Sequence, residues 1–247
     1  MHTDYSSGDV SQKIIVALDV ETEAEAAALL DQLHGYAIWI KIGNQLGTVM
    51  GWKAAIAMVH ERGFSIFCDT KFKDIPETVK KSAAALTAFG PDMFNIMADT
   101  TASVLEAAVR GKNTLDNSQA PLLLGVTVLT AFSNSECQSI YGASASDKVM
   151  QFASQAAAAG LDGVVCSAKE ARLLRQDETT KHLLLITPGV RPTWAAQGDQ
   201  SRVMTPYDAI QAGADYLVIG RPITQPPPEI GSPRAALEKI INELERM

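Results

Sequence analysis

The segment Asp69-Thr70-Lys71-Phe72-Lys73-Asp74 places carboxylate and ammonium groups close together, directly after the apolar run Phe64–Cys68. Side chains two positions apart share one face of a β-strand. We therefore expect Asp69 and Lys71 to lie side by side where this strand ends. Charged groups are costly to remove from water without partners, so the pair indicates a site built for chemistry. The alternative is a structural ion pair that closes the end of the strand.

Lys41 ends a second apolar run, Ala37–Ile42, and we expect it to join Asp69, Lys71 and Asp74 in a set of alternating charges. A neighbouring carboxylate favours the protonated form of an amine. Both lysines are then suited to act as a proton donor and a fixed positive charge. A Schiff-base lysine is not expected, because that role needs a neutral amine.

Three other polar residues follow apolar runs or open a helix, and each has a structural alternative. Asp19 could hold ribose hydroxyls or cap the helix that follows it. Thr130 could contact the edge of a base or satisfy nearby backbone. Asp74-x-x-Glu77 matches a helix capping box, so Asp74 could be a simple N-cap.

Two glycine–arginine pairs follow late apolar runs and suggest an anion site. Gly189 precedes Arg191, and Gly220 precedes Arg221. Glycine lets backbone N–H groups approach an anion, and a guanidinium adds a bidentate charge-assisted contact. Gln200 lies in the long segment after Arg191, and long loops are often functional lids. The alternatives are arginines at the rim of the fold and an exposed loop glutamine.

The elements that must position these residues alternate regularly along the chain. Eight short apolar, β-branched runs are separated by Ala-rich segments with helical spacing, a pattern typical of a single (β/α)₈ TIM barrel. The expected strands are Lys13–Leu18, Ala37–Ile42, Ser65–Asp69, Met93–Met97, Leu122–Val128, Gly163–Cys166, Leu183–Thr187 and Tyr216–Gly220. The expected helices are Glu21–Leu33, Leu46–Arg62, Pro76–Phe89, Thr101–Arg110, Asp147–Ala159, Ser167–Leu174, Pro206–Ala212 and Pro233–Arg246.

This pattern also gives the domain organisation and the place of the site. Residues 1–12 form a polar tail, and residues 13–247 form one barrel domain without repeats or an internal linker. An open doubly wound sheet is the alternative, but no glycine-rich dinucleotide fingerprint follows the first strand. In a TIM barrel the active site lies at the carboxyl ends of the strands, where most of the candidate residues fall.

Composition excludes several classes of function. The 247 residues carry a net charge of −7 and no basic block, so we expect no nucleic-acid partner. No apolar run is long enough to span a membrane, and the first twelve residues have no apolar signal segment. Three cysteines without a C-x-x-C motif suggest a reducing, cytoplasmic setting. No Cys/His/Asp cluster has metal-ligand spacing, so we expect neither a metal nor a cofactor.

These residues occur in seven ordered blocks that together resemble the bacterial orotidine 5′-phosphate decarboxylases. The resemblance implies a cofactor-free (β/α)₈ homodimer that converts orotidine 5′-phosphate to UMP and CO₂, the last step of de novo pyrimidine (UMP) biosynthesis. The blocks are Ile15-Val16-Ala17-Leu18-Asp19, Lys41-Ile42-Gly43, Asp69-Thr70-Lys71-Phe72-Lys73-Asp74-Ile75-Pro76, Gly125-Val126-Thr127-Val128-Leu129-Thr130, Thr187-Pro188-Gly189-Val190-Arg191-Pro192, Gly198-Asp199-Gln200 and Val218-Ile219-Gly220-Arg221-Pro222.

The resemblance also implies catalytic roles. Lys71 would deliver the proton to C6 of the pyrimidine, and Asp69 would sit beside the departing carboxylate. Lys41 would bind the ribose within the same charged network. Asp74, with Thr78 behind it, would reach into the active site of the partner subunit. That last role replaces the N-cap favoured by the local sequence.

Substrate-binding roles follow in the same way. Asp19 would share the ribose with Lys41. Thr130 and Gln200 would contact the pyrimidine and the phosphate. Arg221 would bind the phosphate, with Arg191 nearby.

One segment departs from the family pattern. Many bacterial relatives carry a His-Ala-Ser-Gly-Gly-like run after the fourth strand, whereas this chain has Met97-Ala98-Asp99-Thr100-Thr101. None of the candidate site residues lies in this run, so we expect activity to persist. Two other functions remain open: a Mg²⁺-dependent sugar-phosphate decarboxylase or aldolase of the same superfamily, and a non-catalytic nucleotide-binding barrel.

Overall fold

The computed structural model describes residues 9–114, 120–195 and 204–246 and contains a closed barrel of eight parallel strands in chain order. The strands are β1 Ile14–Ala17, β2 Trp39–Gly43, β3 Ser65–Phe72, β4 Met93–Met97, β5 Leu122–Val126, β6 Gly163–Val165, β7 Leu184–Pro188 and β8 Tyr216–Ile219. Each expected strand overlaps one of these. The barrel prediction is confirmed, and the open doubly wound sheet is wrong.

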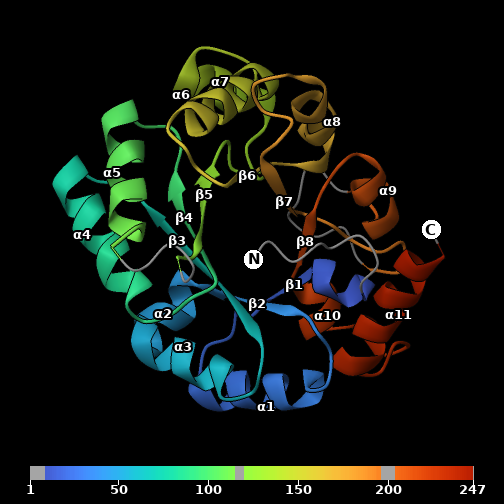
Figure 1. The fold of residues 1–247 in the computed structure, drawn as a ribbon. Helices are drawn as coiled ribbons and strands as arrows, with labels where there is room; N and C mark the ends of the chain where they lie inside the picture. Colours follow the sequence, from blue (N-terminus) through green and yellow to red (C-terminus); the bar gives the residue numbers. More distant parts are fainter. Residues whose placement is uncertain (1–8, 115–119, 196–203, 247) are drawn as a thin grey trace.

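Helices surround the barrel on its outside (Figure 1). They are the 3₁₀ helix η1 Val10–Lys13 and the α-helices α1 Glu23–Leu33, α2 Asn44–Met50, α3 Trp52–His60, α4 Pro76–Thr87, α5 Ala102–Lys112, α6 Asn134–Tyr141, α7 Ala145–Ala158, α8 Ala168–Gln176, α9 Pro206–Gln211, α10 Arg221–Thr224 and α11 Pro233–Glu245. The single helix expected over Leu46–Arg62 is wrong: Gly51, at φ +78°, separates α2 from α3. A positive φ suits glycine and ends the first helix.

Two further α-helices were not anticipated, nor was the 3₁₀ helix η1. The α6 helix is short and mostly polar, and it begins with a capping box formed by Ser133 and Glu136. The α10 helix has only four residues and begins at Arg221. Neither has enough apolar periodicity to be recognised from sequence.

The strands bury both of their faces, which explains their near-continuous apolar runs. Outward side chains pack against the helices, and inward ones fill the barrel. Trp39 and Phe67 belong to the inner cluster as expected. Trp39 also meets Tyr216 edge to face, with ring centroids 5.5 Å apart. The packed interior leaves the carboxyl ends of the strands as the place for a site.

A Gly-x-Asp turn that occurs three times secures the end of the barrel opposite the carboxyl ends of the strands. Gly90-Pro91-Asp92, Gly160-Leu161-Asp162 and Gly213-Ala214-Asp215 each lead into an even-numbered strand, and each glycine has a positive φ. Each aspartate accepts a backbone N–H from the preceding strand and pairs with a basic side chain. Asp92 contacts the Ile66 N–H and the His60 side chain, Asp162 contacts the Leu123 N–H and the Lys112 side chain, and Asp215 contacts the Leu185 N–H and the Arg175 side chain.

Candidate active site

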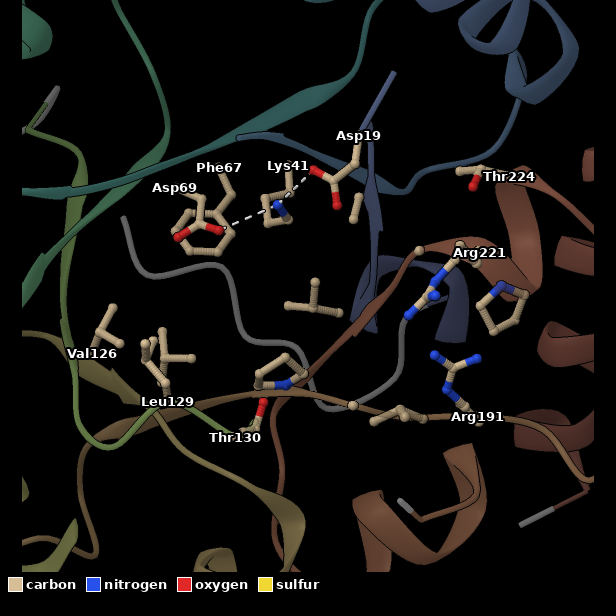
Figure 2. A pocket seen from close by; sticks show the side chains of 18 of the residues that line it. Asp19, Lys41, Phe67, Asp69, Val126, Leu129, Thr130, Arg191, Arg221 and Thr224 are labelled. Atoms are coloured by element: carbon tan, nitrogen blue, oxygen red, sulfur yellow. Dashed lines mark hydrogen bonds and ion pairs between the residues drawn. The ribbon is translucent and has the colours of Figure 1, made fainter. Parts of the chain in front are cut away.

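A cavity of about 480 Å³ opens at the carboxyl ends of the strands. Most of the residues predicted for the site line it: Asp19, Lys41, Asp69, Lys71, Thr130, Arg191, Gly220 and Arg221. In Figure 2, Asp19, Lys41 and Asp69 lie along one side, and Arg191 and Arg221 lie across the cavity from them. The cavity is therefore charged on two sides, and apolar residues such as Val126 and Leu129 also line it.

The charged wall is a chain of alternating signs. Lys41 Nζ lies 3.1 Å from Asp19 Oδ1 and 3.2 Å from Asp69 Oδ2. Lys71 Nζ continues the chain at 2.6 Å from Asp69 Oδ1. The side chains of Lys41 and Asp69 are only 11% and 14% exposed. Every charge in this buried pair is therefore met by an opposite one, as desolvation requires.

The electrostatics fix the charge states of the two most buried members. Burial alone would lower the pKa of Lys41, but the charges of Asp69 and Asp19 outweigh it and raise that pKa above its ordinary value. Burial would likewise raise the pKa of Asp69, but the ammonium groups of Lys41 and Lys71 lower it. Both residues are therefore ionised at neutral pH, so Lys41 cannot act as a neutral amine.

Asp69 and Lys71 lie on the same face of β3, as the strand alternation predicts. Phe67, Asp69 and Lys71 all line the cavity, whereas Cys68 and Phe72 pack with the outer core. The backbone is nevertheless irregular here. Among the described non-glycine residues, Lys71 alone has a positive φ, of 50°, and the pairing of β3 with β4 shifts between Cys68 and Phe72. This bulge was not predicted from the sequence.

Asn95 on β4 contacts this bulge and was missed from the sequence. Its Nδ2 donates to Asp69 Oδ1 at 2.7 Å, and its Oδ1 accepts the Lys71 N–H at 2.7 Å. The available signal was a lone asparagine within the apolar run Met93–Met97.

The opposite wall carries the guanidinium groups of Arg191 and Arg221 (Figure 2). Arg191 is buried, and its backbone N–H donates to the backbone carbonyl of Met204 at 2.9 Å. Gly220 follows β8 and is the N-cap of α10, which begins at Arg221. Two cations in one wall of a cavity suit an anionic group.

Two of the predicted residues lie elsewhere. Asp74 and Thr78 are exposed and do not line the cavity of the single chain. The capping-box alternative for Asp74 is wrong, because the N-cap of α4 is Ile75 and no side chain caps the helix. Asp74 Oδ1 instead accepts the adjacent Ile75 N–H at 2.6 Å. Gln200 lies outside the described residues.

The run that departs from the family pattern forms an ion pair at the rim. Asp99 Oδ2 lies 2.8 Å from Lys73 Nζ and accepts the Tyr141 hydroxyl at 3.2 Å. Burial and the Asp99 charge raise the pKa of Tyr141 to about 12. No residue of Met97–Thr101 lines the cavity. The run therefore ties the β3–α4 loop to α6 without entering the charged wall.

Metal and thiol chemistry have no candidate among the described residues. No group of three or more His, Cys, Asp or Glu side chains is placed to hold a metal ion within residues 9–114, 120–195 and 204–246. The three cysteines are buried, and burial raises the pKa of Cys166 to about 12. A thiol that resists ionisation is a poor nucleophile.

No described helix is both long and apolar enough to cross a membrane.

Several known proteins are similar to this chain in sequence, and one solved structure is similar in architecture. An orotidine 5′-phosphate decarboxylase of Vibrio campbellii is 41% identical over 96% of this chain and 100% of its own. One of Idiomarina loihiensis is 43% identical, over 94% and 97%. The crystal structure of the same-named protein from Lactobacillus acidophilus aligns with a TM-score of 0.77 and 30% identity, over 93% and 97%. Residues 12–240 match the model of the orotidine 5′-phosphate decarboxylase / HUMPS family, and the chain belongs to that family.

Proposed function

We propose that this protein decarboxylates orotidine 5′-phosphate to UMP and CO₂, the last step of UMP synthesis. The observation that carries the proposal is the Asp19–Lys41–Asp69–Lys71 chain facing two arginines across one cavity. Such a cavity can take a molecule with a phosphate at one end and a reacting carboxylate at the other. Relatives that are 41–43% identical over nearly the whole chain carry the name of this activity.

The reaction needs electrostatic help at one carbon. When the C6–carboxylate bond breaks, CO₂ leaves and its bonding electron pair stays on C6, where no adjacent carbonyl can delocalise it. Enzymes typically lower such barriers by about 8–23 kcal/mol. The Lys71 ammonium, fixed against Asp69 at 2.6 Å, would stabilise the developing carbanion. Lys71 then gives a proton to C6 and is reprotonated from solvent.

The remaining groups would bind rather than react. Arg221, with Arg191 beside it, would hold the phosphate, and that binding energy would help to position the distant pyrimidine. Asp19 and Lys41 would hold the ribose hydroxyls. Thr130 lies in the cavity wall and would contact the pyrimidine, and Gln200 would also bind the substrate.

The geometry favours this activity over a Mg²⁺-dependent sugar-phosphate reaction. Lys41 Nζ lies within 3.2 Å of carboxylate oxygens of both Asp19 and Asp69. A divalent cation bound between these two carboxylates would have to displace the ammonium, whose raised pKa keeps it charged. A non-catalytic nucleotide-binding barrel would not need Lys71 beside a buried carboxylate. Tight UMP binding without turnover would nevertheless support it.

We also propose a homodimer in which Asp74 and Thr78 complete the partner's site. Both residues are exposed at the start of α4, next to Ile75, whose side chain is 66% exposed. Mixing inactive Lys71→Ala and Asp74→Ala dimers tests this, because subunit exchange creates sites with both native residues. If Asp74 acts across the interface, about a quarter of wild-type activity should return. No recovery after demonstrated exchange would contradict the shared site.

Lys71→Ala tests the proton-donor role. We expect kcat to fall by at least about 10³-fold, because the variant lacks both the fixed charge and the proton. Circular dichroism should show an unchanged fold, and UMP should still bind through the arginine wall. A purified Lys71→Ala protein with near-wild-type kcat would refute this role.

A further inference from the structure

Asn95 is the polar side chain buried beneath the charged wall. It is 1% exposed and lies on β4, two residues after Met93 of the inner cluster. Alternation along the strand therefore points both side chains into the barrel. An amide in such a place must find partners for both of its ends.

The partners of Asn95 are successive residues of β3. The Lys71 N–H can only donate, so the amide atom 2.7 Å away is Oδ1. The other end is then the NH₂ group, which donates to Asp69 Oδ1 at 2.7 Å. The backbone carbonyl of Asn95 accepts from Thr70 Oγ1 at 2.6 Å. One residue of β4 thus holds three residues in a row.

These contacts replace the strand pairing that the bulge interrupts. Cys68 pairs with Phe94 and Phe72 pairs with Ile96, so three residues of β3 oppose Asn95 alone. Lys71 adopts its positive φ within this stretch, a conformation that non-glycine residues rarely hold without support. The Asn95 amide supplies that support at the Lys71 N–H.

The same amide orients the carboxylate that Lys71 meets. Asp69 Oδ1 receives both Asn95 Nδ2 and Lys71 Nζ, while Oδ2 faces Lys41. The carboxylate therefore has a donor on each oxygen and little freedom to rotate. We propose that Asn95 is a positioning residue, whose amide fixes the bulge that presents Lys71 and turns Asp69 toward both lysines.

Two variants separate the two ends of the amide, and a third is the control. Asn95→Asp keeps an acceptor for the Lys71 N–H but cannot donate to Asp69 when ionised. Asn95→Leu loses both bonds and keeps the branching and the number of heavy atoms of the side chain. Thr180→Val removes a buried hydroxyl that donates to the Leu174 carbonyl and also lies 3.3 Å from Asp177 Oδ1, on the α8–β7 connection away from the cavity.

The kinetic arm of the test rests on the proposed function. We expect kcat to fall by about 100-fold in both Asn95 variants, since small misplacements of a reacting group have effects of that size. KM should change little, because the arginine wall is untouched. The acid limb of the kcat/KM profile should also move to higher pH, because Asp69 loses a donor that lowers its pKa. In Asn95→Asp the new carboxylate beside Asp69 raises that pKa further, while Asp19, Lys41 and Lys71, the other charges of the wall, are the same in every variant.

A second arm does not depend on activity. Exchange of the Lys71 amide proton should be about tenfold faster in Asn95→Leu than in the Thr180→Val control, because its acceptor is gone. In Asn95→Asp the acceptor remains, so that amide should stay protected. The proposal is overturned if Asn95→Asp has the same kcat and the same acid limb as the Thr180→Val control. It is also overturned if the Lys71 amide proton of a folded Asn95→Leu protein exchanges at the rate seen in that control. Absence of turnover in the wild type would defeat the proposed function alone, and amide exchange would still decide the role of Asn95.

Discussion

Asp69→Asn should destabilise the protein, although removing a charge from an active site often does the opposite. The substitution keeps the shape of the side chain and removes the negative charge between two ammonium groups. Lys41, only 11% exposed, would keep just the half-exposed Asp19 as its counter-ion. Loss of one partner from a buried pair costs about 3–5 kcal/mol. The more exposed pair with Lys71 adds at most about 1 kcal/mol.

The pH dependence of this effect has a definite sign. The folded-state pKa of Asp69 lies below its ordinary value of 3.8. Its contribution to stability is therefore complete above that ordinary value and is lost as the pH falls through the folded pKa. The difference in the free energy of unfolding between wild type and Asp69→Asn should be constant from neutral pH down to about pH 5. It should become smaller below about pH 4.

Urea unfolding at fixed protein concentration measures this difference in the free energy of unfolding, and thermal unfolding checks it. We expect the midpoint temperature to fall by about 6–24 °C. Asp31→Asn is the matched control, because it breaks the exposed pair with Arg62 and should change stability by at most about 1 kcal/mol. An Asp69→Asn protein as stable as the wild type at neutral pH would refute the reasoning.

Three other substitutions separate the functions of the two ends of the barrel. Arg221→Ala should raise KM by about 10- to 100-fold through loss of charged hydrogen bonds to phosphate, and an unchanged KM in steady-state kinetics would count against the phosphate site. Asp162→Ala leaves the Leu123 N–H without its acceptor and the Lys112 ammonium without its counter-ion, with the Pro121 carbonyl still 3.4 Å away; it should cost about 2–3 kcal/mol in urea unfolding without altering kcat. Thr205→Ala removes the hydroxyl that caps α9 and should cost about 1 kcal/mol, so an unchanged unfolding midpoint would contradict that role.

The strands and most of the cavity could be predicted because both follow from local patterns. Runs that are buried on both faces are apolar throughout, and polar residues just after them fall at the carboxyl end of the barrel. Asp19, Lys41, Asp69 and Arg221 were placed by that rule alone. Gly51 was missed as a helix break because one glycine in an Ala-rich segment is also compatible with a continuous helix.

Contacts between distant elements were beyond sequence reasoning. The bulge at Lys71 depends on the register of β3 against β4, which no local pattern gives. Asn95 therefore looked like a minor exception in an apolar strand. The Lys73–Asp99 pair links two loops in the same way. The cross-subunit role of Asp74 and Thr78 depends on a second copy, so it stays a prediction.

The most direct test of the central claim is to give EDTA-treated protein orotidine 5′-phosphate and to follow the loss of substrate absorbance together with the release of UMP and CO₂. The account predicts rapid conversion, with one UMP and one CO₂ formed for each substrate consumed, no need for added Mg²⁺, and almost no conversion by Lys71→Ala. Folded wild-type protein that fails to convert the substrate, or that does so only when Mg²⁺ is added, would contradict the account.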